Sequence, residues 1–275
     1  MGEMQETLDL DAIAGEVFSL LGSGRQIAPF SSRHQNFDLQ GAYRVTAKVR
    51  ELREKSGENA RGRKIGFTNR TIWAEYGVHA PIWGYIYDRT IHDLDGIGGE
   101  FALRGLSDPR IEPEIVFGLA TAPQPGMDLP ELLACIDWVA QGFEIVQSVF
   151  PDWRFAATDT VAAFGLHGAL LIGPRHRLRD TEHAWAATLS GFEIELFRDG
   201  VSADRGAAAN VLGGPLLALR HLIDVLAQDA HNPPLAAGEI ITTGTLTRAL
   251  PINAAENWST QLSGVALGGA SVRFS

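Results

Sequence analysis

Short strand-like runs dominate this chain from Lys64 onward, and their irregular spacing limits the folds that it can adopt. Runs such as KIGFT, WGYIY, EPEIVFGLA, TLSGFEIELFRDG and GASVRFS are rich in β-branched and aromatic residues, with Gly, Pro and Asp between them. Only a few helices are predicted among them, over residues 129–136, near Thr158 and over residues 215–228. A parallel sheet needs regular alternation of strands and helices. The pattern therefore favours a mostly β domain, either a sandwich or a rolled barrel.

The N-terminal part of the chain has a different pattern. Apolar residues recur at helical spacing around Ile13 and Val17, and again over residues 39–55. We therefore predict a helical N-terminal segment over residues 1–60, packed on a main domain over residues 61–275. Hydrophobic residues make up 45% of the 275, which is enough to build a proper core.

Charge and cysteine content narrow the classes of partner and compartment. The formal net charge of −10 argues against nucleic acid or an anionic membrane as the main partner. The single cysteine, Cys135, cannot form an internal disulfide, which fits a reducing compartment. The acidic N-terminus does not resemble a secretory signal, and no run approaches the roughly 20 apolar residues of a membrane span. We expect a cytoplasmic protein.

Three glutamates stand in apolar strand-like runs. Glu112 and Glu114 open the run EPEIVFGLA, and Glu144 lies in GFEIVQSVF. Residues i and i+2 of a strand point to the same face, so Glu112 and Glu114 are neighbours. Either that face is open to water or a cation lies between the carboxylates. Hard oxygen ligands select Mg²⁺, Mn²⁺ or Ca²⁺ over Zn²⁺. Two exposed acids on an edge strand and an unrelated third remain the alternative.

Several other polar residues are candidates for the chemistry, each with an ordinary structural alternative. Lys64 lies in an apolar run, where it serves as an acid or base or as the partner of a glutamate. Asp159 is a catalytic candidate or a helix cap. His79 and His167 are candidate proton carriers, although isolated histidines are more often only hydrogen-bonded. The chain contains no GxSxG motif and no phosphate-binding glycine loop.

Eight short segments together carry a family resemblance. In order, they are QIAPFS, GRKIGFTN, EPEIVF, FEIVQS, WRFAATDTVA, VLGGP, ITTGTLT and GGASVRF. With these segments in register from about Gln26 to the C-terminus, the chain resembles the 2-keto-4-pentenoate hydratase and 4-oxalocrotonate decarboxylase group of the fumarylacetoacetate hydrolase superfamily. The resemblance implies an α+β fold, a mixed β-sandwich roll, and assembly into a homo-oligomer.

The resemblance also implies a metal centre. It places the ligands of Mg²⁺ or Mn²⁺ on Glu112, Glu114 and Glu144, the family's lysine on Lys64 and its aspartate on Asp159. The implied substrate is a small 2-oxo acid or its dienol, whose 2-oxygen and carboxylate chelate the ion. The ion then stabilises enolate charge at the 2-oxygen. An arginine such as Arg63 or Arg154 is a further candidate, to hold a substrate carboxylate.

The sequence departs from the hydratases at the positions of their proton chemistry. Their DNAS segment becomes AFGL over residues 163–166, and their VDQPDYG-like segment becomes VHAPIWG. His79 and Ile82 thus replace two acids, Leu166 replaces a serine, and Gln147 replaces a further aspartate. We expect the enolate chemistry to survive with a less polar substrate or a changed reaction, and His79 to take over a proton role.

These observations predict a divalent-metal-dependent lyase that acts on a 2-oxo acid, most simply a hydratase of a 2-hydroxy-dienoate. A C–C bond hydrolase of a β-diketo acid or a 2-oxo acid decarboxylase is the alternative within the same chemistry. A metal-binding homologue without catalysis is a third possibility, to which the lost acid and serine give weight. The intact Lys64 and the three glutamates speak against it.

Overall fold

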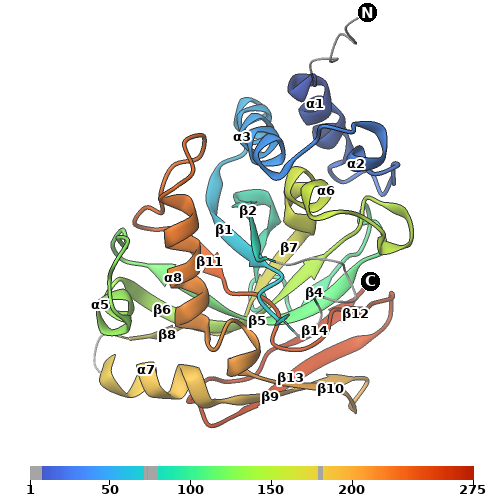
Figure 1. The fold of residues 1–275 in the computed structure, drawn as a ribbon. Coiled ribbons are helices and arrows are strands. Elements are labelled where there is room, and N and C mark those ends of the chain that lie inside the picture. Colours follow the sequence, from blue (N-terminus) through green and yellow to red (C-terminus); the bar gives the residue numbers. More distant parts are fainter. Residues whose placement is uncertain (1–7, 71–72, 74–79, 179–181) are drawn as a thin grey trace, which may run out of the picture.

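A computed structural model describes residues 8–70, 73, 80–178 and 182–275 of the chain. Figure 1 shows two β-sheets with helices at one end and along one flank. The prediction of a mixed α+β roll is confirmed. The helices are α1 (Leu10–Leu20), α2 (Phe30–Arg33), α3 (Leu39–Lys55), α5 (Leu129–Ala134), α6 (Ala157–Ala162), α7 (Glu182–Gly191) and α8 (Pro215–Leu226).

The larger sheet has nine strands and contains both parallel and antiparallel pairs. Its order is β2-β1-β11-β5-β6-β7-β3, with β12 beside β5 and β8 beside β6. The strands are β1 (Ala60–Gly66), β2 (Ile82–Tyr87), β3 (Ile91–Asp93), β5 (Arg110–Leu119), β6 (Ile136–Val146), β7 (His167–Ile172), β8 (His176–Arg177), β11 (Ile240–Thr242) and β12 (Leu250–Pro251).

This sheet curls until β2 approaches β7, which makes it a roll. One set of alternating side chains points into the roll, where Ile86, Val116 and Leu170 form a small buried cluster. Alternation puts Glu112 and Glu114 on the face of β5 that carries Val116. By the same rule Glu144 of β6 shares the face of Ala140, another member of that cluster.

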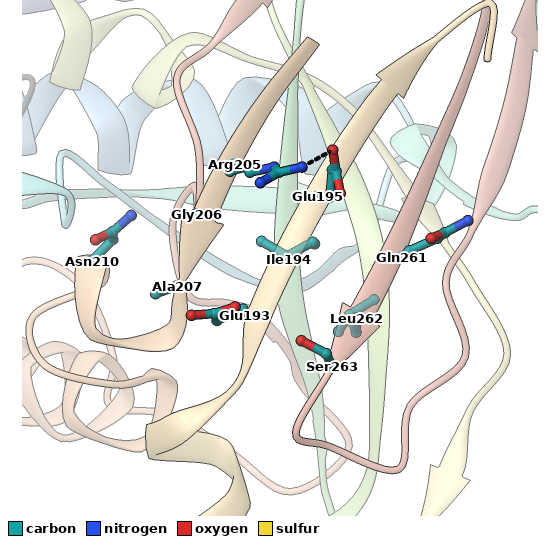
Figure 2. A pocket seen from close by; sticks show the side chains of 10 residues that line it. All are labelled: Glu193, Ile194, Glu195, Arg205, Gly206, Ala207, Asn210, Gln261, Leu262 and Ser263. Atoms are coloured by element: carbon teal, nitrogen blue, oxygen red, sulfur yellow. Dashed lines mark hydrogen bonds and ion pairs between the residues drawn. The ribbon is translucent and has the colours of Figure 1, made fainter. Parts of the chain in front are cut away.

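The smaller sheet packs against part of the outer face of the roll. Its order is β10-β9-β13-β14-β4, with β4 (Glu100–Phe101), β9 (Glu193–Arg198), β10 (Val201–Ala207), β13 (Asn257–Ser263) and β14 (Ser271–Phe274). Phe143 and Ile145 of β6 meet Leu196, Trp258 and Phe274 of this sheet in a buried core. The far side of the sheet carries an open hollow of about 580 Å³ over β9, β10 and β13, where Arg205 pairs with Glu195 (Figure 2).

The helices cover the rest of the roll. α7 and α8 share an apolar core with β1, β2 and β5, and α5 packs beside them (Figure 1). α1 and α3 bury Val17, Val45 and Val49 in a core that also contains Phe150 and Val161 of the main domain. The N-terminal helices thus share a core with the main domain, and the division into residues 1–60 and 61–275 stays a prediction.

Local sequence explains where several helices begin. Asp38 caps α3 by accepting a 2.7 Å hydrogen bond from Gly41 N, and α3 spans the predicted residues. Asp128 and Glu131 form a capping box at α5. One expectation was wrong: the TLSG part of TLSGFEIELFRDG is not a strand, because α7 continues to Gly191. Leu189 of α7 is buried in the core shared with α8, and this tertiary packing overrides the local strand-like pattern.

No helix within the described part of the chain is long and apolar enough to cross a membrane.

Candidate metal centre

The antiparallel pairing of β5 and β6 brings the three glutamates together. Glu112 lies directly opposite Glu144 in the register, and Glu114 is two residues further along β5 on the same face. Each offers a carboxylate oxygen, and these three oxygens lie within 4.8 Å of one another. We call this group of Glu112, Glu114 and Glu144 the carboxylate floor.

Two of the three carboxylates are fully buried, and each has one oxygen held by the protein. Oε2 of Glu114 accepts a 2.8 Å hydrogen bond from Gly244 N. Oε1 of Glu144 lies 2.8 Å from Nδ1 of His167. Oε1 of Glu114 is buried without a hydrogen-bond partner. Oε2 of Glu144 is also buried, and Lys64 Nζ lies 3.1 Å from it. Buried acceptors without partners are rare and call for an explanation such as an ion.

Gly244 can only be a glycine at its position. Its φ is +95°, and a Cβ there would lie 1.7 Å from the Thr68 hydroxyl oxygen. The backbone N–H that holds Glu114 therefore depends on this residue.

Lys64 supplies a positive charge beside the floor. It is 2% exposed, and its Nζ lies 3.1 Å from Oε2 of Glu144. Nζ also donates a 2.9 Å hydrogen bond to the carbonyl oxygen of Gly165. With three carboxylates and one ammonium, the group carries an excess of two negative charges when all are ionised. One divalent cation would neutralise that excess.

Burial and neighbouring charges shift the pKa values of the three floor glutamates. Burial raises the pKa of Glu112 to about 7, a rise that Lys64 opposes and Glu144 reinforces. Burial and the two neighbouring carboxylates raise the pKa of Glu114 well above its usual value. Burial also disfavours the Glu144 carboxylate, yet Lys64 and His167 together lower its pKa. The metal-free floor therefore holds protons that a cation would displace.

A small cavity of about 30 Å³ opens beside Lys64 and Glu112. Apart from these two, Gly66, Gly165 and Thr245, its lining is apolar. We call the apolar part the apolar wall: Phe67, Ile82, Val146, Trp153 and Leu166. The Glu112 carboxylate and the Lys64 ammonium thus line the same cavity as the apolar wall.

The wall stands on unusual backbone. Phe67, Trp153 and Leu166 have φ values of 54°, 55° and 63°, which side chains other than glycine rarely adopt. The turn η4 (Phe164–Leu166) is left-handed at all three residues, and its Gly165 carbonyl is the one that accepts from Lys64. Strained backbone of this kind is characteristic of functional sites.

The donor set fits a hard divalent cation. All three candidate ligands are carboxylates, Glu114 has a buried oxygen without a hydrogen-bond partner, and one oxygen from each of the three lies close enough to converge on one ion. Mg²⁺, Mn²⁺ and Ca²⁺ prefer such oxygen ligands.

Comparisons with known proteins show the family to which the chain belongs. No protein-family model matches it. It is 32% identical to a 2-hydroxyhexa-2,4-dienoate hydratase of Comamonas testosteroni over 94% of either chain. The chain belongs to the hydratase and decarboxylase group of the fumarylacetoacetate hydrolase superfamily. It is also 29% identical to a 4-oxalocrotonate decarboxylase of Pseudomonas putida over 98% of this chain and all of that one.

Solved structures of the superfamily have the same fold. A 4-oxalocrotonate decarboxylase from Pseudomonas putida G7, complexed with magnesium and adipate, superposes with a TM-score of 0.87 at 26% identity. The superposition covers 98% of this chain and 99% of the decarboxylase chain. A fumarylpyruvate hydrolase from Pseudomonas aeruginosa, in complex with Mn²⁺ and pyruvate, has a TM-score of 0.55 at 16% identity, over 78% of this chain and 88% of that one. The second likeness shows the fold alone.

The structure brings some of the predicted site residues together and separates others. Lys64 and the carboxylate floor form one group. Asp159 is buried apart from it: its carboxylate accepts hydrogen bonds from Ser31 N at 2.8 Å, Ser31 Oγ at 2.6 Å and Ala156 N at 2.8 Å. Asp159 thus joins α6 to the N-terminal segment at α2. His79 lies outside the described residues.

The structure also locates positions at which the resemblance implies a departure from the hydratases. Ile82 and Leu166, which the resemblance matches to an acid and a serine, both line the cavity. Gln147 instead supports the backbone, since its Oε1 accepts from Ser107 N at 3.2 Å. Arg63 is buried and pairs with Glu239 at 2.7 Å, so its charge is already matched.

Two residues of the site were not recognised from the sequence. His167 was considered only as a proton carrier, and Gly244 only as part of the ITTGTLT resemblance. Their roles depend on the pairing of β6 with β7 and on the loop after β11, and a single sequence contains no direct signal for either.

Proposed function

We propose that this chain is a divalent-metal-dependent hydratase of a 2-hydroxy-2,4-dienoate whose far end is uncharged. The observation that carries the proposal is one small cavity lined both by the apolar wall and by Glu112 and Lys64, with Glu114 and Glu144 grouped beside Glu112. The 32% identical relative, named as a 2-hydroxyhexa-2,4-dienoate hydratase, supports the same substrate class.

Glu112, Glu114 and Glu144 would hold Mg²⁺ or Mn²⁺. When bound, such an ion supplies Lewis acidity to the 2-oxygen and carboxylate of a 2-oxo acid and stabilises negative charge there. The magnesium complex of the 26% identical decarboxylase supports a divalent ion at this site.

Lys64 would act as a fixed donor. Burial opposes its charge, yet the three nearby glutamates outweigh this effect and raise its pKa in the metal-free site. In the metal-free site this favours the ammonium form, which would hold charge or deliver a proton from Nζ. The Gly165 carbonyl aims it, which gives the AFGL turn a role in positioning.

The apolar wall would choose the substrate. Burying a carboxylate against Ile82, Val146 and Leu166 without a partner is costly, whereas a methyl group or vinyl carbon gains from burial there. Asp159 would contribute indirectly, by anchoring the segment around Ser31.

Decarboxylation of a 2-oxo acid is the second candidate, because the structure with a TM-score of 0.87 is a 4-oxalocrotonate decarboxylase. The two candidates differ in the far end of the substrate, since 4-oxalocrotonate is a dicarboxylate. The apolar wall favours hydration.

The deciding experiment incubates the protein with Mg²⁺ and a matched pair of substrates, 2-hydroxyhexa-2,4-dienoate and 4-oxalocrotonate. Loss of dienol absorbance, the hydrated product and CO₂ are all followed. We expect hydration of the first substrate and no CO₂ from the second. CO₂ release from 4-oxalocrotonate as the faster reaction would assign a decarboxylase. Adding acylpyruvates to the panel tests the C–C hydrolase alternative, and no turnover of any substrate would support a non-catalytic homologue.

A homo-oligomer and a cytoplasmic location remain predictions from the resemblance and the composition. Light scattering coupled to size-exclusion chromatography measures the first, and cell fractionation measures the second.

A further inference from the structure

One buried side chain beside the carboxylate floor has no part in the function proposed so far. His167, at the start of β7, is 3% exposed. Its Nδ1 lies 2.8 Å from Oε1 of Glu144, and its Nε2 lies 2.9 Å from the Thr90 hydroxyl oxygen. The imidazole thus spans the space between a floor carboxylate and the turn after β2.

The direction of the bond to Glu144 follows from the chemistry of the two groups. An ionised carboxylate only accepts hydrogen bonds, so the proton shared with Glu144 belongs to Nδ1. This holds for a neutral or a protonated ring. In the neutral ring Nε2 is then an acceptor and faces the Thr90 hydroxyl, which also lies 3.0 Å from Tyr87 O and 3.4 Å from Tyr87 N.

The two buried floor carboxylates follow one plan. Gly244 N holds one oxygen of Glu114, and His167 holds one oxygen of Glu144. The other oxygen of Glu114 has no hydrogen-bond partner, and the other oxygen of Glu144 lies 3.1 Å from Lys64 Nζ. Glu114 is held by the main chain, but Glu144 depends on a side chain, and a side chain can be exchanged by mutation.

We propose that His167 is a positioning residue that orients Glu144: its Nδ1–H fixes Oε1, and Oε2 is thereby presented to the cation. The inference rests on the proposed metal site. Outer partners of metal ligands typically change metal affinity by about 10- to 100-fold when they are removed. The ring itself is held by Thr90 and by its place at the start of β7, whose paired strand β6 carries Glu144.

The experiment uses two amide variants that separate the two ring nitrogens. The carboxamide nitrogen of Asn can take the place of Nδ1, and that of Gln can take the place of Nε2. His167→Asn therefore keeps a donor for Glu144, whereas His167→Gln keeps only the contact with Thr90. Mn²⁺ affinity of the full chain is measured by calorimetry without substrate, and thermal melting confirms that each variant is folded.

We expect His167→Gln and His167→Ala to bind Mn²⁺ about 10- to 100-fold more weakly than wild type. His167→Asn should recover most of the loss. Equal affinity of the Asn and Gln variants, or wild-type affinity of His167→Ala, would overturn the positioning role. A wild-type chain that binds no Mn²⁺ would overturn the metal site of the proposed function and this inference with it. Turnover of substrates does not enter the measurement.

A second readout needs no metal. ¹⁵N NMR of histidine-labelled protein, with His167→Gln to assign the signal, reports which ring nitrogen carries the proton. We expect a protonated Nδ1, and Thr90→Val should disturb that signal more than Thr90→Ser does. A bare Nδ1 would overturn the proposal.

Discussion

The carboxylate floor and the apolar wall meet at one cavity, which Glu112 lines together with the wall, but they are built in different ways. The floor stands on two long paired strands, β5 and β6, whose register alone brings Glu112 opposite Glu144. Three of the five wall residues, Phe67, Trp153 and Leu166, instead have positive φ. The register of the sheet therefore positions the carboxylates that would bind the ion, whereas turns with positive φ shape the wall that the substrate would contact.

Removing one floor carboxylate should have the largest effect. In Glu114→Gln we expect turnover to fall by about 10²- to 10³-fold, because one ligand of the charge-stabilising ion is lost. The metal-free variant should melt no lower than wild type, since repulsion among buried carboxylates is relieved. Steady-state assays with Mg²⁺ and calorimetric melting measure the two effects. The exposed Glu100→Gln of β4 is the control, and a similar loss there would contradict the comparison.

Removing the Lys64 ammonium beside the floor should have the second-largest effect on turnover. Lys64→Met should lower turnover by about 10²-fold, since a positioned donor contributes about that much. Metal-free protein should lose ~3 kcal/mol of unfolding free energy, because Glu144 is left buried without its ion pair. Lys48→Met is the matched control, since Lys48 pairs with Asp11 at the surface. Unchanged kinetics in Lys64→Met would remove the lysine from the mechanism.

The floor also predicts how metal affinity depends on pH. Burial raises the pKa of Glu112 to about 7, so in the metal-free protein its carboxyl is increasingly protonated below that pH. A proton and a cation compete for the same oxygens. We expect Mn²⁺ affinity to fall between pH 8 and pH 6, by up to about tenfold per pH unit below 7. Calorimetry across this range measures it, and a flat profile would contradict the assignment of Glu112.

Substitutions in the apolar wall should have the smallest effect, and that effect should be on KM. Ile82→Ala removes apolar surface from the cavity, so KM for a dienoate with an uncharged end should rise about tenfold. Ile86 is buried on the same strand but does not line the cavity. Ile86→Ala should therefore lower stability with KM unchanged. Equal KM changes in the two variants would show that the wall does not touch the substrate.

The sequence predicted the floor much better than the wall. Paired glutamates in an apolar strand, a third in a second strand and the family resemblance together led to Lys64, Glu112, Glu114 and Glu144. Strand alternation is local, so it can be read from sequence. The replacements at Ile82 and Leu166 were also located, although the positive φ of Leu166 depends on the packing of η4 and has no local signal.

The remaining differences have physical causes of the same kind. The sequence predicts a strand at TLSG because this segment adjoins a true strand, whereas in the structure it ends α7, which packs against α5 and α8. His167 was placed among the proton carriers because a single sequence does not give the register of β7 against β6. Asp159 was open between catalysis and capping, and its three hydrogen bonds to Ser31 and Ala156 now support an anchoring role.

The central claim is that Glu112, Glu114 and Glu144 bind one divalent ion, and anomalous X-ray scattering from crystals grown with Mn²⁺ tests it most directly. We expect one strong anomalous peak among the three glutamates, about 2.0–2.6 Å from one oxygen of each. In Glu114→Gln this peak should be lost. A peak elsewhere, or no peak among the three glutamates at saturating Mn²⁺, would show that they are not the metal ligands.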